Sequence, residues 1–412
     1  MERSASRSNL FRIAIRKFGP FASAIRKQWE IFAATENIGL ELDAPELDLH
    51  PLCESLFDQD GLRNGDWDIA FINTDWVAAC HEKRALGNLA PLLEADPPEG
   101  YPMAWTPSLL RLQEIDGEVL GLPYHDGPEC LIYRKDLLED PAEKQAYQAK
   151  YGSALRLPET WHEFRQLAHH FTRREKGLYG TVYAAYPDGH NTVYDFCLQL
   201  WTRGGELTDS QGHVRLDTPQ AIEALEFYRL MLEDGEAVHP GSRELDSVKT
   251  GYAFAAGEVA FMVNWFGFAA MAETIPESRV KGCVGVAEIP HAEGCSGTSL
   301  NIYWILSIAA GSPHRYVAWR FLRHCASASM DKLLTLEGAI GCRKSTWMDE
   351  DVNRVIPFYR KMEDLHAHAR EMPRRADWPR ISEVIDRMVM ETINSREAIQ
   401  AIVQRAQHSL LA

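Results

Sequence analysis

The sequence predicts an α/β protein of two domains, and three observations support that prediction. The chain has 412 residues, which is more than one simple hydrophobic core ordinarily accommodates. Short apolar runs alternate with stretches of helical periodicity, a pattern typical of parallel βαβ units. A segment rich in turn-forming residues, 124–128 (YHDGP), separates two predicted strands, as a hinge between two domains would.

The first domain begins with two pairs of a strand and a helix. Residues 10–15 form an apolar strand, and after the turn at 18–21 (FGPF) residues 22–33 carry apolar side chains at helical spacing. Residues 67–72 (WDIAFI) predict a second buried strand, which leads through residues 73–76 (NTDW) into a helix. Because ligands bind beyond the carboxyl ends of strands in such sheets, both loops are candidate sites.

Further along the chain, helix starts and strands are marked by local signals. Thr160 followed by Glu163 forms a capping box, and Thr218 precedes a proline at the first position of another helix. A third helix is predicted from Thr192, and Pro313 opens a fourth. Short apolar runs predict strands at 130–133, 259–264, 284–289 and 302–308.

Composition and charge argue against nucleic acid as a partner and against a membrane-spanning helix. The chain is 45% hydrophobic and 25% charged, as in ordinary globular proteins. Its net charge of -16 argues against nucleic acid, which is bound by clustered lysine and arginine. The most apolar stretch, residues 251–271, contains Glu258 and Asn264 and does not supply the roughly 20 apolar residues of a membrane helix.

The cysteines and the N-terminal residues bear on the compartment. The eight cysteines show no CxxC spacing, so we expect neither a metal site nor a redox site. Cys283 and Cys295 could pair in an oxidising compartment, whereas most of the eight are expected to be buried free thiols. The opening residues, MERSASRSNLFRIAI, lack the apolar core of a signal peptide, which indicates either a leader removed or a cytoplasmic protein.

Six segments in series resemble a known family. They are WDIAFINTDWVAACHEKRALGNLAPLLE, IDGEVLGLPYHDGPECLIYRKDLLE, PETWHEFRQLAHHFT, GYAFAAGEVAFMVNWFGF, VGVAEIP with NIYWILSIAAGSPHRYVAWRFLRHCAS, and GAIGCRKSTW. Together they resemble family 1 of the periplasmic (extracellular) solute-binding proteins of ABC transporters, the maltose-binding-protein-like sugar binders. The resemblance extends from Phe11 to about Ala406.

The resemblance implies a periplasmic-binding-protein-like α/β fold of two lobes, each a mainly parallel sheet flanked by helices. A hinge with three crossings would join the lobes, near residues 124–129, 283–286 and 325–330. The N-terminal lobe would contain residues 1–125 and 286–326, and the C-terminal lobe residues 129–283 and 330–412. Closure of such a hinge would trap a ligand between the lobes.

The resemblance also implies a function. We expect the substrate-binding component of an ABC-type importer, which captures a carbohydrate or related polar solute without reacting with it. Its partners would be that small molecule and the membrane permease subunits, with no nucleic acid, no cofactor and no metal. We expect a monomer in the periplasm or cell envelope.

A sugar site needs aromatic rings for the C–H faces and charged or amide groups for the hydroxyl edges. The loops expected to form the site, together with the resemblance, supply twelve such candidates. The expected ligand-binding residues are Phe18, Asp75, Trp76, His125, Asp126, Tyr186, Trp265, Phe266, Tyr303, Trp304, Arg343 and Trp378.

Each candidate has a structural alternative. Asp75 could cap a helix, and Trp76 could be the first buried residue of that helix. Trp265 could belong to the core of its lobe. Strand alternation should turn one ring of the pair Tyr303 and Trp304 inward.

Two rival functions are weighed against a binding protein of an importer. Acid pairs such as Asp377 and Glu383 could act as glycosidase carboxylates, but the chain contains no GxSxG, P-loop, HExxH or dinucleotide motif. We therefore expect no enzyme. The second rival is a cytoplasmic or sensor-associated solute-binding protein of the same fold, which the absent leader favours.

Overall fold

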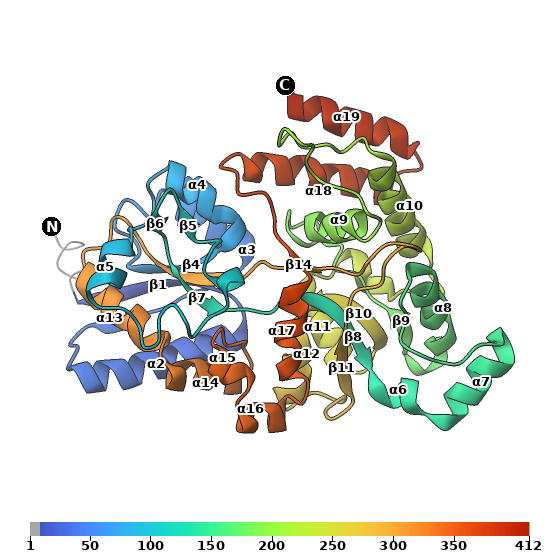
Figure 1. Cartoon of the computed structure of the whole chain (residues 1–412), viewed down its shortest axis with the longest axis horizontal. Coiled ribbons are helices and arrows are strands. Elements are labelled where there is room, and N and C mark those ends of the chain that lie inside the picture. The colour runs from blue at the N-terminus through green and yellow to red at the C-terminus, as the bar shows by residue number, and fades with distance from the viewer. Residues whose placement is uncertain (1–8, 412) are drawn as a thin grey trace. The chain divides into compact units, whose positions relative to one another are not determined.

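A computed structural model describes residues 9–411 of the chain, which divides into two compact units (Figure 1). Unit 1 contains the chain as far as Gly127, then Ile302–Arg360 and Met372–Trp378. Unit 2 contains Pro128–Asn301, Lys361–Glu371 and Pro379–Ala412. The prediction about a leader concerns residues 1–15, and the first eight of them lie outside the described residues.

The boundaries of the units differ from those expected, except at the first crossing. The chain leaves unit 1 after Gly127, inside the segment 124–129. Residues 286–301 belong to unit 2, not to the first lobe, and the chain returns to unit 1 only at Ile302. Helix α14 (Ala328–Leu336) remains in unit 1 because it packs on α2 (Gly19–Glu36), where the Gln28 amide donates to the Met330 carbonyl at 3.1 Å.

Unit 1 is built on a mixed sheet in the order β2-β1-β4-β13-β7, with β3 paired to β1. Strand β1 runs parallel to β2, β3 and β4, whereas β13 runs antiparallel to β4 and to β7. Every residue of β4 is buried, as expected for a strand covered on both faces. The strands are β1 (Leu10–Arg16), β2 (Glu41–Asp43), β3 (Glu46–Leu47), β4 (Ile69–Asn73), β7 (Leu122–His125) and β13 (Trp304–Ile308).

Helices cover both faces of this sheet, and Figure 1 shows α2 and α4 on opposite sides of it. A small hairpin of β5 (Glu114–Ile115) and β6 (Glu118–Val119) precedes β7. The other helices of unit 1 are α3 (Leu49–Cys53), the π-helix η1 (Glu54–Asp58), α4 (Val77–Glu82), α5 (Ala90–Ala95), α13 (Arg315–Cys325), α15 (Lys344–Trp347) and α16 (Glu350–Val355).

Unit 2 is built on a four-stranded sheet in the order β11-β8-β10-β9, formed by β8 (Glu129–Arg134), β9 (Tyr179–Thr181), β10 (Val259–Trp265) and β11 (Val284–Ala287). Only β9 and β10 are parallel; β8 is antiparallel to both of its neighbours. The expectation of a mainly parallel sheet is therefore wrong for unit 2. Strands β12 (Ser299–Leu300) and β14 (Ala369–Arg370) form a separate parallel pair.

The helices of unit 2 pack on this sheet, with α8 and α11 in contact with β10. They are α6 (Lys135–Glu139), α7 (Pro141–Tyr151), α8 (Trp161–Phe171), α9 (Asn191–Trp201), α10 (Pro219–Glu233), α11 (Ser247–Ala255), α12 (Phe266–Thr274), α17 (Met362–Ala367), α18 (Trp378–Asn394) and α19 (Ile399–Leu411). Short 3-10 turns complete the chain at Thr74–Trp76, Pro107–Leu109, Arg174–Lys176, Pro240–Arg243 and Tyr359–Lys361.

Several local predictions are confirmed. The capping box of α8 is present, since the Thr160 side chain accepts from the Glu163 N–H and the Glu163 carboxylate accepts from the Thr160 N–H. Thr218 caps α10. The helix expected to open at Pro313 begins two residues later, at Arg315.

The remaining sequence features concern cysteines, metals and membranes. All eight cysteines are free thiols, so Cys283 and Cys295 do not pair. Across residues 9–411, no cluster of three or more histidine, cysteine or acidic side chains has the arrangement of a metal site. Within the same residues, none of the helices combines the length and the apolar character that a bilayer crossing requires.

Candidate functional site

The candidate site in unit 1 lies where its central strands end. Asp75 and Trp76 follow β4, and His125 is the last residue of β7. Strand β13 runs in the opposite direction, and its first residue, Trp304, lies opposite both Asn73 and His125. The sheet therefore brings these side chains to one edge, as the strand-end rule predicts.

Aromatic rings pack together at this edge. Phe21 makes edge-on contacts with Phe18 at a centroid distance of 5.0 Å, with His125 at 4.7 Å and with Trp304 at 6.4 Å. Trp304 also meets Trp76 at 5.6 Å and 90°. Phe18, Phe21 and Trp76 are buried, whereas Trp304 and His125 keep exposed surface. The buried rings thus support the two that remain accessible.

Asp75 is held by a tryptophan that lies 303 positions later in the sequence. The Trp378 indole N–H donates to Asp75 Oδ2 at 3.2 Å. The capping role falls to Asn73, whose side chain accepts from the Asp75 N–H, so Asp75 is not the cap. Trp378 is only 1% exposed, which leaves it the role of orienting Asp75. The structure thus brings together two of the predicted residues.

His125 is held as a neutral imidazole. Its Nδ1 accepts a hydrogen bond from the Ile340 N–H at 2.9 Å, so its proton resides on Nε2. Burial lowers the pKa of His125 to about 3, although the neighbouring Asp126 acts in the opposite direction. Asp126 is itself buried, and its N–H donates to the Ile340 carbonyl at 3.0 Å. The side chain of His125 therefore offers a hydrogen-bond donor, Nε2–H, and no charge.

Three further candidates are buried and serve the structure. The Arg343 guanidinium donates to the carbonyls of Glu99 and Ala326 and stacks over the Trp105 ring. Tyr303 is the ring that alternation turns inward, and its hydroxyl donates to Gln113 at 2.7 Å. In unit 2, Phe266 is fully buried in the first turn of α12.

The candidate site in unit 2 centres on Trp265, which ends β10 and keeps exposed surface. Its ring meets the Tyr194 ring of α9 edge-on, with centroids 5.6 Å apart. Tyr186, in the loop between β9 and α9, is 41% exposed, and the Lys249 ammonium lies 5.6 Å from its ring. These residues give unit 2 an aromatic face of its own.

Two acids of unit 2 were not among the predicted residues. Glu129 begins β8 directly opposite Trp265, and Asp195 follows Tyr194 on α9. Burial, followed by the charge of Asp195, raises the pKa of Glu129 well above its usual range. Burial likewise raises the pKa of Asp195 to about 7, although the Tyr228 hydroxyl donates to it. The sequence does contain a signal for Asp195, because it is the one acidic residue within the apolar run VYDFCLQLW.

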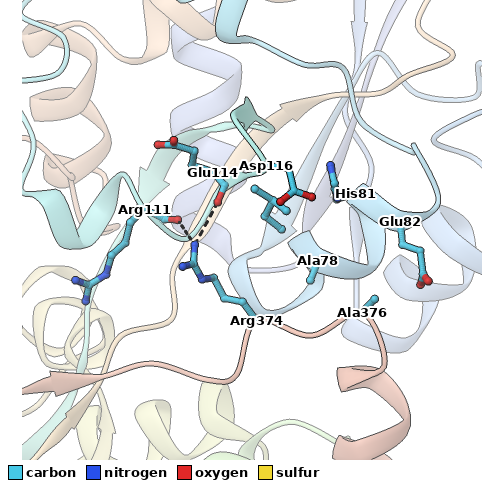
Figure 2. A pocket seen from close by; sticks show the side chains of 9 residues that line it. Ala78, His81, Glu82, Arg111, Glu114, Asp116, Arg374 and Ala376 are labelled. Carbon is cyan, nitrogen blue, oxygen red and sulfur yellow. Dashed lines mark hydrogen bonds between the residues drawn. The ribbon is translucent and has the colours of Figure 1, made fainter. Parts of the chain in front are cut away.

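A hollow of about 720 Å³ on unit 1 contains none of the predicted residues. Figure 2 shows the side chains that line it. It lies between α4, the β5–β6 hairpin and the segment that leads to Trp378. Arg374 closes one side, because its guanidinium donates to the carbonyls of Arg111 and Glu114 (Figure 2). His81, Glu82 and Asp116 line the other walls.

Comparisons with known proteins agree with this architecture. Residues 59–332 match the family model described as bacterial extracellular solute-binding protein. A probable ABC transporter-binding protein of Deinococcus radiodurans is 23% identical over 79% of this chain and 74% of its own length. A putative binding protein of Brucella abortus is 23% identical over 74% of this chain and 68% of its own.

Solved structures share the fold over nearly the whole chain. Maltose-bound MalE3 of T. maritima superposes with a TM-score of 0.85 at 23% identity, covering 97% of this chain and 98% of that one. A ribitol complex of an ABC transporter solute-binding protein of Agrobacterium radiobacter gives 0.85 at 23% identity, with 97% of each chain covered. A mannitol complex from Agrobacterium vitis gives 0.82 at 20% identity, covering 98% and 97%. The expected fold family is confirmed.

Proposed function

Because this chain belongs to the family of bacterial extracellular solute-binding proteins, we propose that it captures a carbohydrate or a polyol as the substrate-binding component of an ABC-type importer. The family consists of binding proteins, in agreement with the expectation that the chain is no enzyme. The ligand class is supported by the maltose, ribitol and mannitol complexes of proteins that share the fold.

The observation that carries the ligand class is the edge of unit 1, where rings and polar groups alternate. Trp304 supplies an accessible aromatic face beside an oriented carboxylate, Asp75, and a neutral donor, His125. A polyhydroxy solute needs these three elements: a ring against its C–H groups, and an acceptor and a donor for its hydroxyls. The arrangement suits a neutral ligand, since the Nε2–H of His125 donates without adding charge.

We infer that both units contribute ligand contacts. In unit 1 these are Asp75, His125 and Trp304, and in unit 2 they are Tyr186 and Trp265. The other predicted residues act behind them: Phe18, Trp76, Asp126, Phe266, Tyr303, Arg343 and Trp378 are buried and hold the contacts in place. Closure of a hinge around the ligand stays a prediction.

The place of action and the partners follow from the family. We propose that the protein works in the periplasm or cell envelope as a monomer and delivers its ligand to membrane permease subunits. The name of the Deinococcus radiodurans relative, a probable ABC transporter-binding protein, supports this assignment. A pull-down with the permease subunits of the same transporter, with and without ligand, would test it.

The ligand class is tested by thermal shift and calorimetry with maltose, ribitol and mannitol. A ligand at 100 times its dissociation constant stabilises the protein by about 2.7 kcal/mol. We expect Trp265→Ala to weaken binding roughly 30-fold or more, about 2 kcal/mol, as loss of a stacking ring does. Tyr252→Ala, which removes an exposed ring of the same unit, is the matched control.

Two outcomes would contradict the proposal. If no sugar or polyol shifts the melting temperature, the ligand class is wrong. If Trp265→Ala lowers the melting temperature of the ligand-free protein by many degrees while the affinity stays unchanged, Trp265 is a core residue.

A further inference from the structure

We propose that unit 2 carries a subsite for a positively charged group on the ligand, formed by Glu129 and Asp195 beside the rings of Trp265 and Tyr194. The inference rests on the proposed function and narrows its ligand class. The solute would be a polyhydroxy compound with a primary ammonium group, such as an amino polyol or an amino sugar.

The sheet and α9 bring the four side chains to one place. Glu129 and Trp265 are paired residues of antiparallel strands, so their side chains point to the same face. Trp265 contacts Tyr194 of α9, and Asp195 is the next residue of that helix. Asp195 and Val263 line one small cavity, and Val263 lies two residues before Trp265 and therefore on the same face of β10. In agreement with this placement, burial and then the charge of Asp195 raise the pKa of Glu129.

The acids have no basic partner in their own unit. Among residues 9–411, no lysine, arginine or histidine lies within ion-pair distance of either carboxylate. Asp195 accepts one hydrogen bond, from the Tyr228 hydroxyl at 2.9 Å. Glu129 is 3% exposed, and its Oε2 is buried without a hydrogen-bond partner in the described part of the chain. A buried carboxylate is costly unless a cation or donors satisfy it, so the pair lacks a counter-charge.

A cavity of about 10 Å³ beside Asp195, too small for a ligand itself, adds two oxygen atoms with no donor assigned to them. Its walls include Thr181 and Tyr183. The hydroxyl oxygens of both are buried and have no hydrogen-bond partner among residues 9–411. An ammonium group has three N–H donors and no acceptor, and it therefore matches a site that presents oxygen atoms and carboxylates.

The ionisable groups whose charges interact with the two acids supply no positive charge. They are Asp188, Cys197, Tyr228, Cys130 and Tyr183. His190, which precedes α9, has its ring centroid 5.0 Å from that of Tyr194 and is the histidine of this neighbourhood. Cations act on three of these neighbours but are engaged elsewhere. Arg203 donates to the Gln199 carbonyl, Lys361 donates to the Val286 carbonyl, and Arg370 pairs with Glu206.

An ammonium group fits this environment better than a hydroxyl group. Without a cation the acids must retain protons, as the raised pKa values of Glu129 and Asp195 indicate. A ligand hydroxyl leaves the carboxyl groups protonated. An ammonium group lets a carboxyl group release its proton to solvent, because its positive charge then compensates the carboxylate. An aromatic ring also attracts a cation through its ring electrons, and Trp265 is the ring of this pair that keeps exposed surface.

The test compares polyols that differ in one group: ribitol with 1-amino-1-deoxyribitol, and mannitol with 1-amino-1-deoxymannitol. Calorimetric titrations are run at pH 6 and pH 8, where an alkylamine remains protonated. The ionised fraction of a carboxyl group with a pKa of about 7 rises from about a tenth to about nine tenths over this range. We expect the affinity for the amino polyol to rise about 10-fold from pH 6 to pH 8, and that for the neutral polyol to stay constant.

Matched variants separate this subsite from general charge. Glu129→Gln and Asp195→Asn should each abolish the preference for the amino polyol and its pH dependence. Glu236→Gln removes an exposed acid of the same unit and should change neither. Melting temperatures of the ligand-free variants establish that each is folded.

The outcomes distinguish the subsite from the proposed function. If neutral polyols bind and their amino forms bind no better at pH 8, the subsite is overturned while the proposed function stands. If none of the four compounds and no sugar binds, the proposed function fails and the subsite fails with it. A preference that persists in both variants would also overturn the subsite.

Discussion

The two units hold the side chains that we propose as ligand contacts in different ways. In unit 1, Asp75 is held by Trp378 and His125 is held by the backbone of Ile340, so the polar groups at the strand ends have fixed partners. In unit 2, Glu129 is buried and Asp195 is half-buried, and the two share a single hydroxyl donor, that of Tyr228. Unit 1 is therefore organised before a ligand arrives, whereas unit 2 keeps an electrostatic imbalance that a ligand can relieve.

This difference teaches that burial alone does not identify a binding residue. Arg343 and Tyr303 are about as buried as Glu129, but the Arg343 guanidinium donates to two carbonyls and the Tyr303 hydroxyl donates to Gln113. A buried group that makes such hydrogen bonds within its own unit supports the fold. A buried carboxyl group with neither a donor nor a counter-charge differs from these, because its ionised form is costly until a ligand supplies one.

The comparison predicts that the free energy of unfolding depends on pH in opposite directions for the two units. The larger change comes from His125 of unit 1. Its pKa is lowered to about 3 by burial, against about 6.5 in an unfolded chain, so the unfolded chain binds more protons between these values. Stability is therefore present above pH 6.5 and is lost as the pH falls towards 3. We expect a loss of about 2 kcal/mol between pH 6.5 and pH 4.5 from this group, measured by urea unfolding.

The matching variant is His125→Asn, which places an amide oxygen where Nδ1 accepts from Ile340 but cannot titrate. In this variant the free energy of unfolding should fall much less between pH 6.5 and pH 4.5. His162→Asn, at an exposed histidine of unit 2, is the control and should leave that fall unchanged. An identical fall in His125→Asn and the parent protein would contradict the assignment.

Asp195 of unit 2 should act in the opposite direction and by a smaller amount. Burial raises its pKa to about 7, against about 3.9 in an unfolded chain, so the folded state binds more protons between these values. The contribution is fully present below pH 4 and is lost as the pH rises to 7. Because Asp195 keeps some exposed surface, we expect about 1.5 kcal/mol over this range, recovered in Asp195→Asn.

The measurement is again urea unfolding, with the parent protein and Asp195→Asn compared at pH 5 and pH 7. If the variant gains no stability at pH 7 relative to pH 5, the Asp195 carboxyl is solvated, and the imbalance attributed to unit 2 does not exist.

Local order was predictable from the sequence because its signals are local. The capping box at Thr160, the capped start of α10 and the buried strands follow from spacing and residue type. The two-lobe architecture required a family resemblance. The place of α14 in unit 1 was missed because it depends on a long-range contact, between Gln28 and Met330, that no local pattern records.

The site was predictable where it depends on strand ends and unpredictable where it depends on packing. Asp75, Trp76 and His125 follow from the rule that ligands bind beyond strand ends, and the structure brings them together with Trp304. Alternation indicates that one ring of Tyr303 and Trp304 faces inward, but not which one. Asp195 stands in an apolar run, and its importance depends on Glu129, which lies 66 positions earlier in the sequence.

The smallest expected effect tests how unit 1 holds its carboxylate. Trp378→Phe keeps a buried, although smaller, aromatic ring and removes the indole N–H that donates to Asp75. The lost hydrogen bond to a charged acceptor should cost about 1 kcal/mol of stability. Ligand affinity should fall about 5-fold, or about 1 kcal/mol, because Asp75 is no longer oriented before binding.

Phe358→Leu, at a buried ring of the same unit with no such donor, should reduce stability without this loss of affinity. Unchanged affinity in Trp378→Phe would mean that Asp75 is not oriented by Trp378, and the contrast between a preorganised unit 1 and an unbalanced unit 2 would have to rest on His125 alone.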